Sequence, residues 1–169
     1  MFINFDKRCN PLESIYEKLE KRINKRNFSS YQFYKRDSYN ISCNWKIYMD
    51  NYLEGLHIPI VHSELNKTIN YKSYKTEIHD QFSLQWCSID QQLNPYKNDS
   101  SEDLIAYYVT IFPNVILNIA PGRLQTNIVE PIDEKSCLVH FDYYFEQIDE
   151  NQVQRDLDFS DIIQREDIE

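Results

Sequence analysis

Histidines and carboxylates gather in one short stretch of this sequence, with a proline between them. Asp50, Glu54 and His57 follow one another at intervals of four and three residues, so on a helix they would share one side. His57 and His62 are five residues apart, and on a continuous helix their directions would differ by roughly 140°. Pro59 breaks a helix here and would let the chain turn, which would bring His62 back beside His57. Two imidazoles around a bend, with a carboxylate nearby, could bind a metal ion.

Two histidines and one carboxylate can occupy one face of an octahedral metal ion. Non-haem Fe(II) oxygenases use this ligand set, because it leaves open positions where O₂ and a substrate can meet. Two histidines at this spacing are also common as structural or surface residues. The spacing alone therefore leaves both interpretations open.

The helix that would carry these residues is predicted from Asn44, a favourable N-cap, to Ile58. We expect Pro59 to end it, because proline disfavours the helical conformation at the preceding residue. Its apolar positions have the spacing of an amphipathic helix. They are Trp45, Tyr48, Met49, Tyr52, Leu53 and Leu56.

The rest of the chain predicts a mixture of helices and antiparallel strands. Helices are expected at 11–25 and 156–169, a strand end at 2–5, and a polar loop at 94–103. Further strands are expected at 31–42, 74–79, 82–89, 106–112, 115–120, 123–131 and 136–147. Turn signals at Pro113-Asn114 and Pro121-Gly122 join consecutive strands, which indicates an antiparallel meander in an α+β fold with helices on one face.

Composition limits the classes of function. The 169 residues suit one domain, and 18 Lys and Arg against 27 Asp and Glu give a net charge of −9. That charge argues against nucleic acid and against an anionic membrane as partners. The sequence has no glycine-rich nucleotide motif, no apolar run near the ~20 residues of a membrane helix and no evident signal peptide. With four widely spaced cysteines, we expect a cytoplasmic protein with free thiols.

Three short motifs together resemble the signature of Rieske-type aromatic-ring-hydroxylating oxygenase α subunits. They are NWK at 44–46, DNYLE at 50–54 and H-x-P-x-x-H at 57–62. The composite is specific, because it fixes about ten positions within roughly nineteen residues. Weaker resemblance extends over nearly the whole chain, at the opening FINF, at Phe112-Pro113-Asn114 and at the closing 164–167.

The resemblance implies the fold and the metal ligands. It implies the helix-grip (START/Bet v 1-like) fold, in which a curved antiparallel sheet surrounds a long helix and encloses an apolar pocket. His57 and His62 would be ligands of a mononuclear Fe(II), and Asp167 the third, with Asp161 as the fallback. Core or pocket positions on the strands would be Tyr107, Val109, Ile111, Leu117, Ile119 and Phe141.

Glu54 lies close to the position where the family has a carboxylate between an iron-ligating histidine and a Rieske-cluster histidine on a neighbouring subunit. Asp50 is the other candidate for this catalytic role. Such a group would orient the imidazole and could pass electrons or protons across the interface. Without the motif, both residues would be read as solvated helix residues.

The sequence departs from the family in its cysteines. A Rieske [2Fe–2S] cluster needs C-x-H and C-x-x-H, and only Cys137 with His140 has half of that form. On a strand these two side chains would point to opposite faces, so we do not assign them to a cluster. We expect residues 1–169 to form a single catalytic domain without the N-terminal Rieske domain and with its C-terminal helix cut short.

The implied function is hydroxylation of an aromatic or other small organic substrate by a non-haem Fe(II) oxygenase with O₂. Electrons would come from a Rieske cluster on a partner chain, fed by a ferredoxin and a reductase, and the chain alone would be inactive. The family also implies a homotrimer. Two alternatives remain open: a metal-free helix-grip domain that binds a small molecule, and a nonfunctional fragment of an oxygenase.

Overall fold

The computed structural model describes residues 5–23, 26–89 and 104–168, without the side chains of Ile15 and Ile168. The loop expected at 94–103 lies outside these ranges, as does the strand end expected at 2–5 apart from Phe5. No helix in the described ranges is long and apolar enough to cross a membrane.

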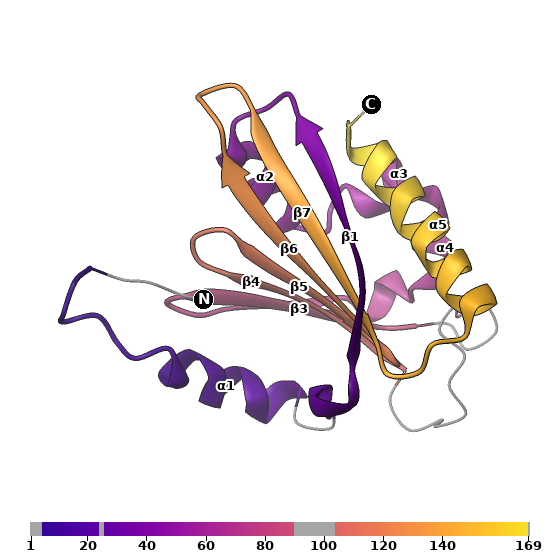
Figure 1. The fold of residues 1–169 in the computed structure, drawn as a ribbon, viewed down its shortest axis with the longest axis horizontal. Helices are drawn as coiled ribbons and strands as arrows, with labels where there is room; N and C mark the ends of the chain where they lie inside the picture. The colour runs from indigo at the N-terminus through magenta and orange to yellow at the C-terminus, as the bar shows by residue number, and fades with distance from the viewer. Residues whose placement is uncertain (1–4, 24–25, 90–103, 169) are drawn as a thin grey trace.

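A seven-stranded sheet dominates this part of the chain, in the order β1-β7-β6-β5-β4-β3-β2, and every neighbouring pair is antiparallel (Figure 1). Each strand begins and ends within two residues of its predicted position, since the alternation of apolar and polar residues sets its limits. The strands are β1 Gln32–Ile41, β2 Lys75–Ile78, β3 Phe82–Ser88, β4 Ile105–Ile111, β5 Val115–Ala120, β6 Arg123–Pro131 and β7 Cys137–Phe145.

Helices cover both faces of the sheet. Helix α5 (Glu150–Ile168) lies against one face together with α2 (Trp45–Tyr52), and the short helices α3 (Ile58–Val61) and α4 (Ser63–Thr68) lie beside α5 (Figure 1). Helix α1 (Glu13–Ile23) packs on the opposite face. The expected α+β architecture, a curved antiparallel sheet around a long helix, is confirmed, while α1 packs on the opposite face from α5.

Helix α5 begins at Glu150, six residues before the predicted start at 156. Asp149 caps it, because its carboxylate accepts hydrogen bonds from the backbone N–H groups of Asn151 and Gln152 at 3.0 and 3.1 Å. Val153 and Leu157 then bury their side chains against the sheet. The helix therefore runs along this face of the sheet before it reaches Asp167.

The prediction of one helix from Asn44 to Ile58 is wrong at its C-terminal end. Helix α2 ends at Tyr52, and Pro59 lies in the first turn of the separate helix α3, where a missing N–H is tolerated. Asp50 therefore remains on α2, whereas Glu54 and His57 lie in the connection. These three residues do not share a helix face.

A close approach of the backbone to Tyr74 explains why the connection runs where it does. A Cβ on Gly55 would lie 2.7 Å from ring atoms of Tyr74, so any larger residue would have to displace that ring. The Tyr74 hydroxyl donates to Gln85, whose Nε2 donates to the carbonyl of Tyr52, each at 2.8 Å. The sheet thus holds the chain on both sides of Glu54.

The cysteines differ in burial, and their reactivity should differ accordingly. Cys9 is exposed, whereas burial raises the pKa of Cys87 to about 12 and that of Cys137 to about 11. At pH 8 only about one Cys87 in ten thousand would be a thiolate. We expect iodoacetamide to label Cys9 in the native protein, and Cys87 and Cys137 only after denaturation, as read by mass spectrometry. Equal labelling rates in the native protein would contradict this packing.

Candidate metal centre and adjoining cavity

Three side chains from two distant parts of the chain meet at one point. His57 and His62 flank α3, and Asp167 lies near the end of α5. One potential ligand atom from each of them lies within 4.8 Å of the other two, and the two imidazole centroids are 5.0 Å apart. The chain does turn between the histidines as expected, and the short helix α3 makes the turn.

Each imidazole is oriented by a carboxylate on its outer side. Nδ1 of His57 lies 2.5 Å from Glu54 Oε1, and Nδ1 of His62 lies 3.0 Å from Glu166 Oε2. Both Nε2 atoms are therefore the ones left for a metal, and Nε2 of His62 lies 3.1 Å from Asp167 Oδ1. A carboxylate behind each imidazole fixes its tautomer and strengthens it as a ligand.

Burial and charge act in opposite directions at His62, whose side chain is 3% exposed. Burial lowers its pKa, but hydrogen bonds and charge from Asp167 and Glu166 outweigh burial, so its pKa is raised. At Glu54, partial burial would raise the pKa, but hydrogen bonds from His57 and from the Leu56 backbone N–H lower it. The site is thus rich in negative charge, which favours a cation.

The other carboxylates considered from the sequence lie apart from this centre. Asp161 pairs with Arg165, with 2.8 Å between Oδ2 and Nε, and Asp50 is exposed on α2. Asn51 does take part, because its amide donates to Asp167 Oδ1 at 2.9 Å. The structure therefore brings together His57, His62 and Asp167 rather than the Asp161 alternative.

Glu166 is the residue that sequence reasoning missed. Its position next to Asp167 was the available signal, because consecutive helical residues differ by about 100° and can approach one imidazole from two sides. The rotation of α5 about its axis, which its packing against the sheet determines, decides whether Glu166 or Asp167 approaches Nδ1 of His62.

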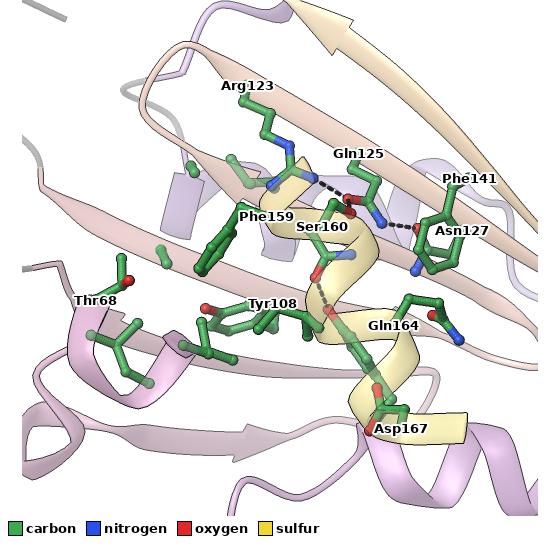
Figure 2. Close-up of a pocket in the computed structure, with 18 of the residues that line it drawn as sticks. Thr68, Tyr108, Arg123, Gln125, Asn127, Phe141, Phe159, Ser160, Gln164 and Asp167 are labelled. Carbon is green, nitrogen blue, oxygen red and sulfur yellow. Dashed lines mark hydrogen bonds between the residues drawn. The ribbon is translucent and has the colours of Figure 1, made fainter. Parts of the chain in front are cut away.

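Two adjoining cavities, of about 110 and 100 Å³, extend from this centre between α5 and the sheet. The smaller is lined by Glu54 and both histidines, and Asp167 lines both. Figure 2 shows Asp167 and Gln164 on α5 below the polar side chains of the sheet. Aromatic rings of Tyr48, Tyr52, Tyr108, Phe141 and Phe159 form much of the wall of the larger cavity.

The strand residues proposed for core or pocket divide between the two faces. Phe141 lines the larger cavity, whereas Tyr107, Val109, Ile111 and Ile119 pack in the cluster that contains α1, and Ile119 also borders the cavity. Leu117 also packs against that cluster. The neighbouring positions Tyr108 and Asn118 line the cavity instead, because alternate side chains of a strand face opposite ways.

The residues at the centre fit a mononuclear Fe(II). Two neutral imidazoles and one carboxylate are the donors that this ion takes in non-haem oxygenases, and each imidazole has its outer nitrogen occupied by a carboxylate. Cys137 and His140 offer no cluster site: Cys137 is buried in the core, and His140 Nδ1 contacts Ser38.

Comparison with curated proteins finds oxygenases. Choline monooxygenase of Arabidopsis thaliana, a chloroplastic protein, is 34% identical over 139 residues, which are 79% of this chain and 32% of that protein. The carnitine monooxygenase oxygenase subunit of Acinetobacter pittii is 27% identical over 93% of this chain and 44% of its own length. The chain thus spans less than half the length of these relatives.

Solved structures share the fold. The quaternary ammonium Rieske monooxygenase CntA matches 99% of this chain and 46% of its own, with a TM-score of 0.81 and 20% identity. Naphthalene 1,2-dioxygenase matches 95% of this chain and 45% of its own, with a TM-score of 0.67 and 16% identity. The family model of the ring-hydroxylating alpha subunit (catalytic domain) matches residues 28–169. With its fold and its sequence in agreement, this chain belongs to the ring-hydroxylating oxygenase alpha subunits and represents their catalytic domain.

Proposed function

We propose that this chain is the non-haem iron catalytic domain of an oxygenase that oxidises a small quaternary ammonium compound with O₂. The observation that carries the proposal is the convergence of His57, His62 and Asp167 at the wall of an aromatic cavity. When bound, Fe(II) supplies the open coordination positions and the redox chemistry that O₂ activation requires.

The cavity supports a cationic substrate rather than an aromatic hydrocarbon. Rings of Tyr52 and Tyr108 stand edge to face, with 6.4 Å between their centroids, and aromatic faces attract a quaternary ammonium. Arg123 is held by Asp156, with 2.8 Å between Nε and Oδ2, so its charge is offset. The choline and carnitine monooxygenases among the relatives point to the same substrate class.

Within this proposal, His57, His62 and Asp167 hold the iron, and Glu54 and Glu166 keep both imidazoles in the tautomer that leaves Nε2 free. Asn51 keeps the Asp167 carboxylate turned toward the centre. The aromatic wall excludes water and holds the ammonium group.

Electrons would enter from a Rieske cluster carried outside residues 1–169, supplied by a ferredoxin and a reductase. The Glu54 side chain is 42% exposed beside His57, so a partner's histidine could reach it. Apolar side chains close to Glu54 in the sequence are exposed, Leu56 at 77% and Ile60 at 87%. An exposed apolar surface next to a functional carboxylate is typical of a docking surface. A neighbouring subunit of a homotrimer is the partner that we propose for it.

Anaerobic Fe(II) binding to the purified chain tests the proposal. The wild type is expected to bind one Fe(II) per chain, and His57→Ala to lose it, because removing one of three protein ligands leaves an incomplete site. Titration under anaerobic conditions followed by iron analysis of the desalted protein gives the stoichiometry.

The same experiment separates the two alternatives. A well-folded wild type that takes up no iron would overturn the oxygenase proposal and favour a metal-free binding domain, in which His57→Ala leaves ligand binding intact. A chain that neither folds cooperatively nor binds iron would be a nonfunctional fragment. Circular dichroism during thermal unfolding distinguishes these outcomes.

A further inference from the structure

One end of the larger cavity is a wall of buried polar side chains. Arg123, Gln125 and Asn127 follow one another on the same face of β6, and Ser160 faces them from α5 (Figure 2). Gln125 Oε1 accepts from Arg123 and, at 3.2 Å, from the Ser160 hydroxyl. Gln125 Nε2 then donates to Asn127 Oδ1 at 2.7 Å. Hydrogen bonds therefore run in one direction, from the guanidinium towards Asn127.

This series of hydrogen bonds ends at the carboxamide of Asn127, whose N–H groups remain available as donors. Asn127 is 3% exposed and lines the cavity, and no partner for its Nδ2 occurs among the described residues. Hydrogen bonds linked in series polarise one another, so donation from Arg123 to Gln125 strengthens the N–H groups of Asn127 as donors.

Gln164 adds a second unsatisfied carboxamide to the same cavity. It is 3% exposed, and its Oε1 accepts from the Tyr48 hydroxyl at 2.9 Å, which turns Nε2 away from that hydroxyl. Within the described part of the chain, Nε2 has no hydrogen-bond partner. An enclosed N–H without a partner is destabilising, and a ligand oxygen would satisfy it.

We propose that Gln164 and Asn127 form a hydrogen-bonding subsite for an oxygen atom of the substrate. The enzyme would then select quaternary ammonium compounds that carry a hydroxyl or carboxylate group. This inference rests on the proposed function and adds the second group by which the substrate is recognised.

The position of Gln164 on α5 sets where that oxygen lies. Gln164 precedes Asp167 by three residues, so the two lie on one side of the helix about 4.5 Å apart along its axis. A substrate oxygen held at Gln164 would lie next to the metal centre, and the aromatic wall would take the ammonium group. The subsite thus orients the substrate as well as selecting it.

Binding of matched ligand pairs tests the subsite. Calorimetry with the anaerobic Fe(II)-loaded chain compares choline with propyltrimethylammonium, in which a methyl group replaces the hydroxyl. A second pair compares γ-butyrobetaine with (4-methylpentyl)trimethylammonium, in which an isopropyl group replaces the carboxylate. The wild type is expected to prefer the oxygen-bearing member of at least one pair by about tenfold, the effect of one buried hydrogen bond. The preferred pair identifies the group as hydroxyl or carboxylate.

Variants assign the preference to Gln164. Gln164→Leu should bind both members of the pair equally. Because that change leaves the buried Tyr48 hydroxyl unpaired, the double variant Tyr48→Phe with Gln164→Leu removes both partners together and should fold. Thr110→Val is the matched control: Oγ1 of Thr110 is also buried without a partner among the described residues, but Thr110 does not line the cavity. This control should keep the wild-type preference.

The outcomes separate the two proposals. Equal binding of both members of each pair by the wild type overturns the subsite while quaternary ammonium binding stands. A preference that persists in the double variant overturns the assignment to Gln164. If no ammonium ligand binds to the iron-loaded chain, the proposed substrate class fails, and the subsite fails with it.

Discussion

Replacing Asp167 by alanine is expected to weaken Fe(II) binding by more than a hundredfold. Removing a group that only orients a metal ligand lowers metal affinity by about 10–100-fold. Asp167 would itself be a ligand, so its removal should have a larger effect. The change also leaves His62 Nε2 and the Asn51 amide without their carboxylate partner. Anaerobic Fe(II) titration of the wild type and of Asp167→Ala measures the difference.

Asp161→Ala is the matched control for this prediction. Asp161 lies on the same helix and was the alternative third ligand, but its carboxylate pairs with the exposed Arg165. Because an exposed ion pair contributes little to stability, Asp161→Ala should bind Fe(II) as the wild type does. Loss of iron in Asp161→Ala with retention in Asp167→Ala would reverse the assignment.

Replacing Glu54 by glutamine is expected to lower turnover with a Rieske partner roughly a hundredfold or more, in the range of effects for groups that transfer protons or orient catalytic imidazoles. The amide keeps the size of the side chain but removes its charge, so the link between His57 and an incoming partner is lost. At saturating Fe(II) the stoichiometry should remain one per chain, because all three ligands are retained even where the affinity falls. Turnover by the chain reconstituted with its Rieske subunit and reductase gives the effect.

Hydrogen peroxide separates electron entry from chemistry at the iron. Hydrogen peroxide is equivalent to O₂ plus two electrons and two protons. A reaction driven by peroxide therefore needs no electrons from a Rieske cluster. Glu54→Gln should therefore retain peroxide-driven oxidation while losing the electron-driven reaction. Asp50→Asn, an exposed substitution on α2, should retain both. A parallel loss of both reactions in Glu54→Gln would place Glu54 in the chemical step instead of electron entry.

The sequence by itself determined the strands, the fold class and the family. Alternating apolar residues placed each strand within two residues of its observed limits, because a strand with one buried face must alternate. The motifs at 44–62 pointed to His57 and His62, and the closing residues pointed to Asp167. These signals are local, so they could be read along the chain without knowing what packs against what.

The tertiary structure decided the rest. Helix α2 ends at Tyr52 because the connection must pass against Tyr74, which lies nineteen residues beyond Gly55. Glu166 contacts His62 only because α5 packs against the sheet and ends beside α3 (Figure 1). Tyr108 and Gln164 line the cavity because of the side on which α5 covers the sheet. Each of these facts depends on contacts between residues far apart in the chain, and no local pattern encodes such contacts.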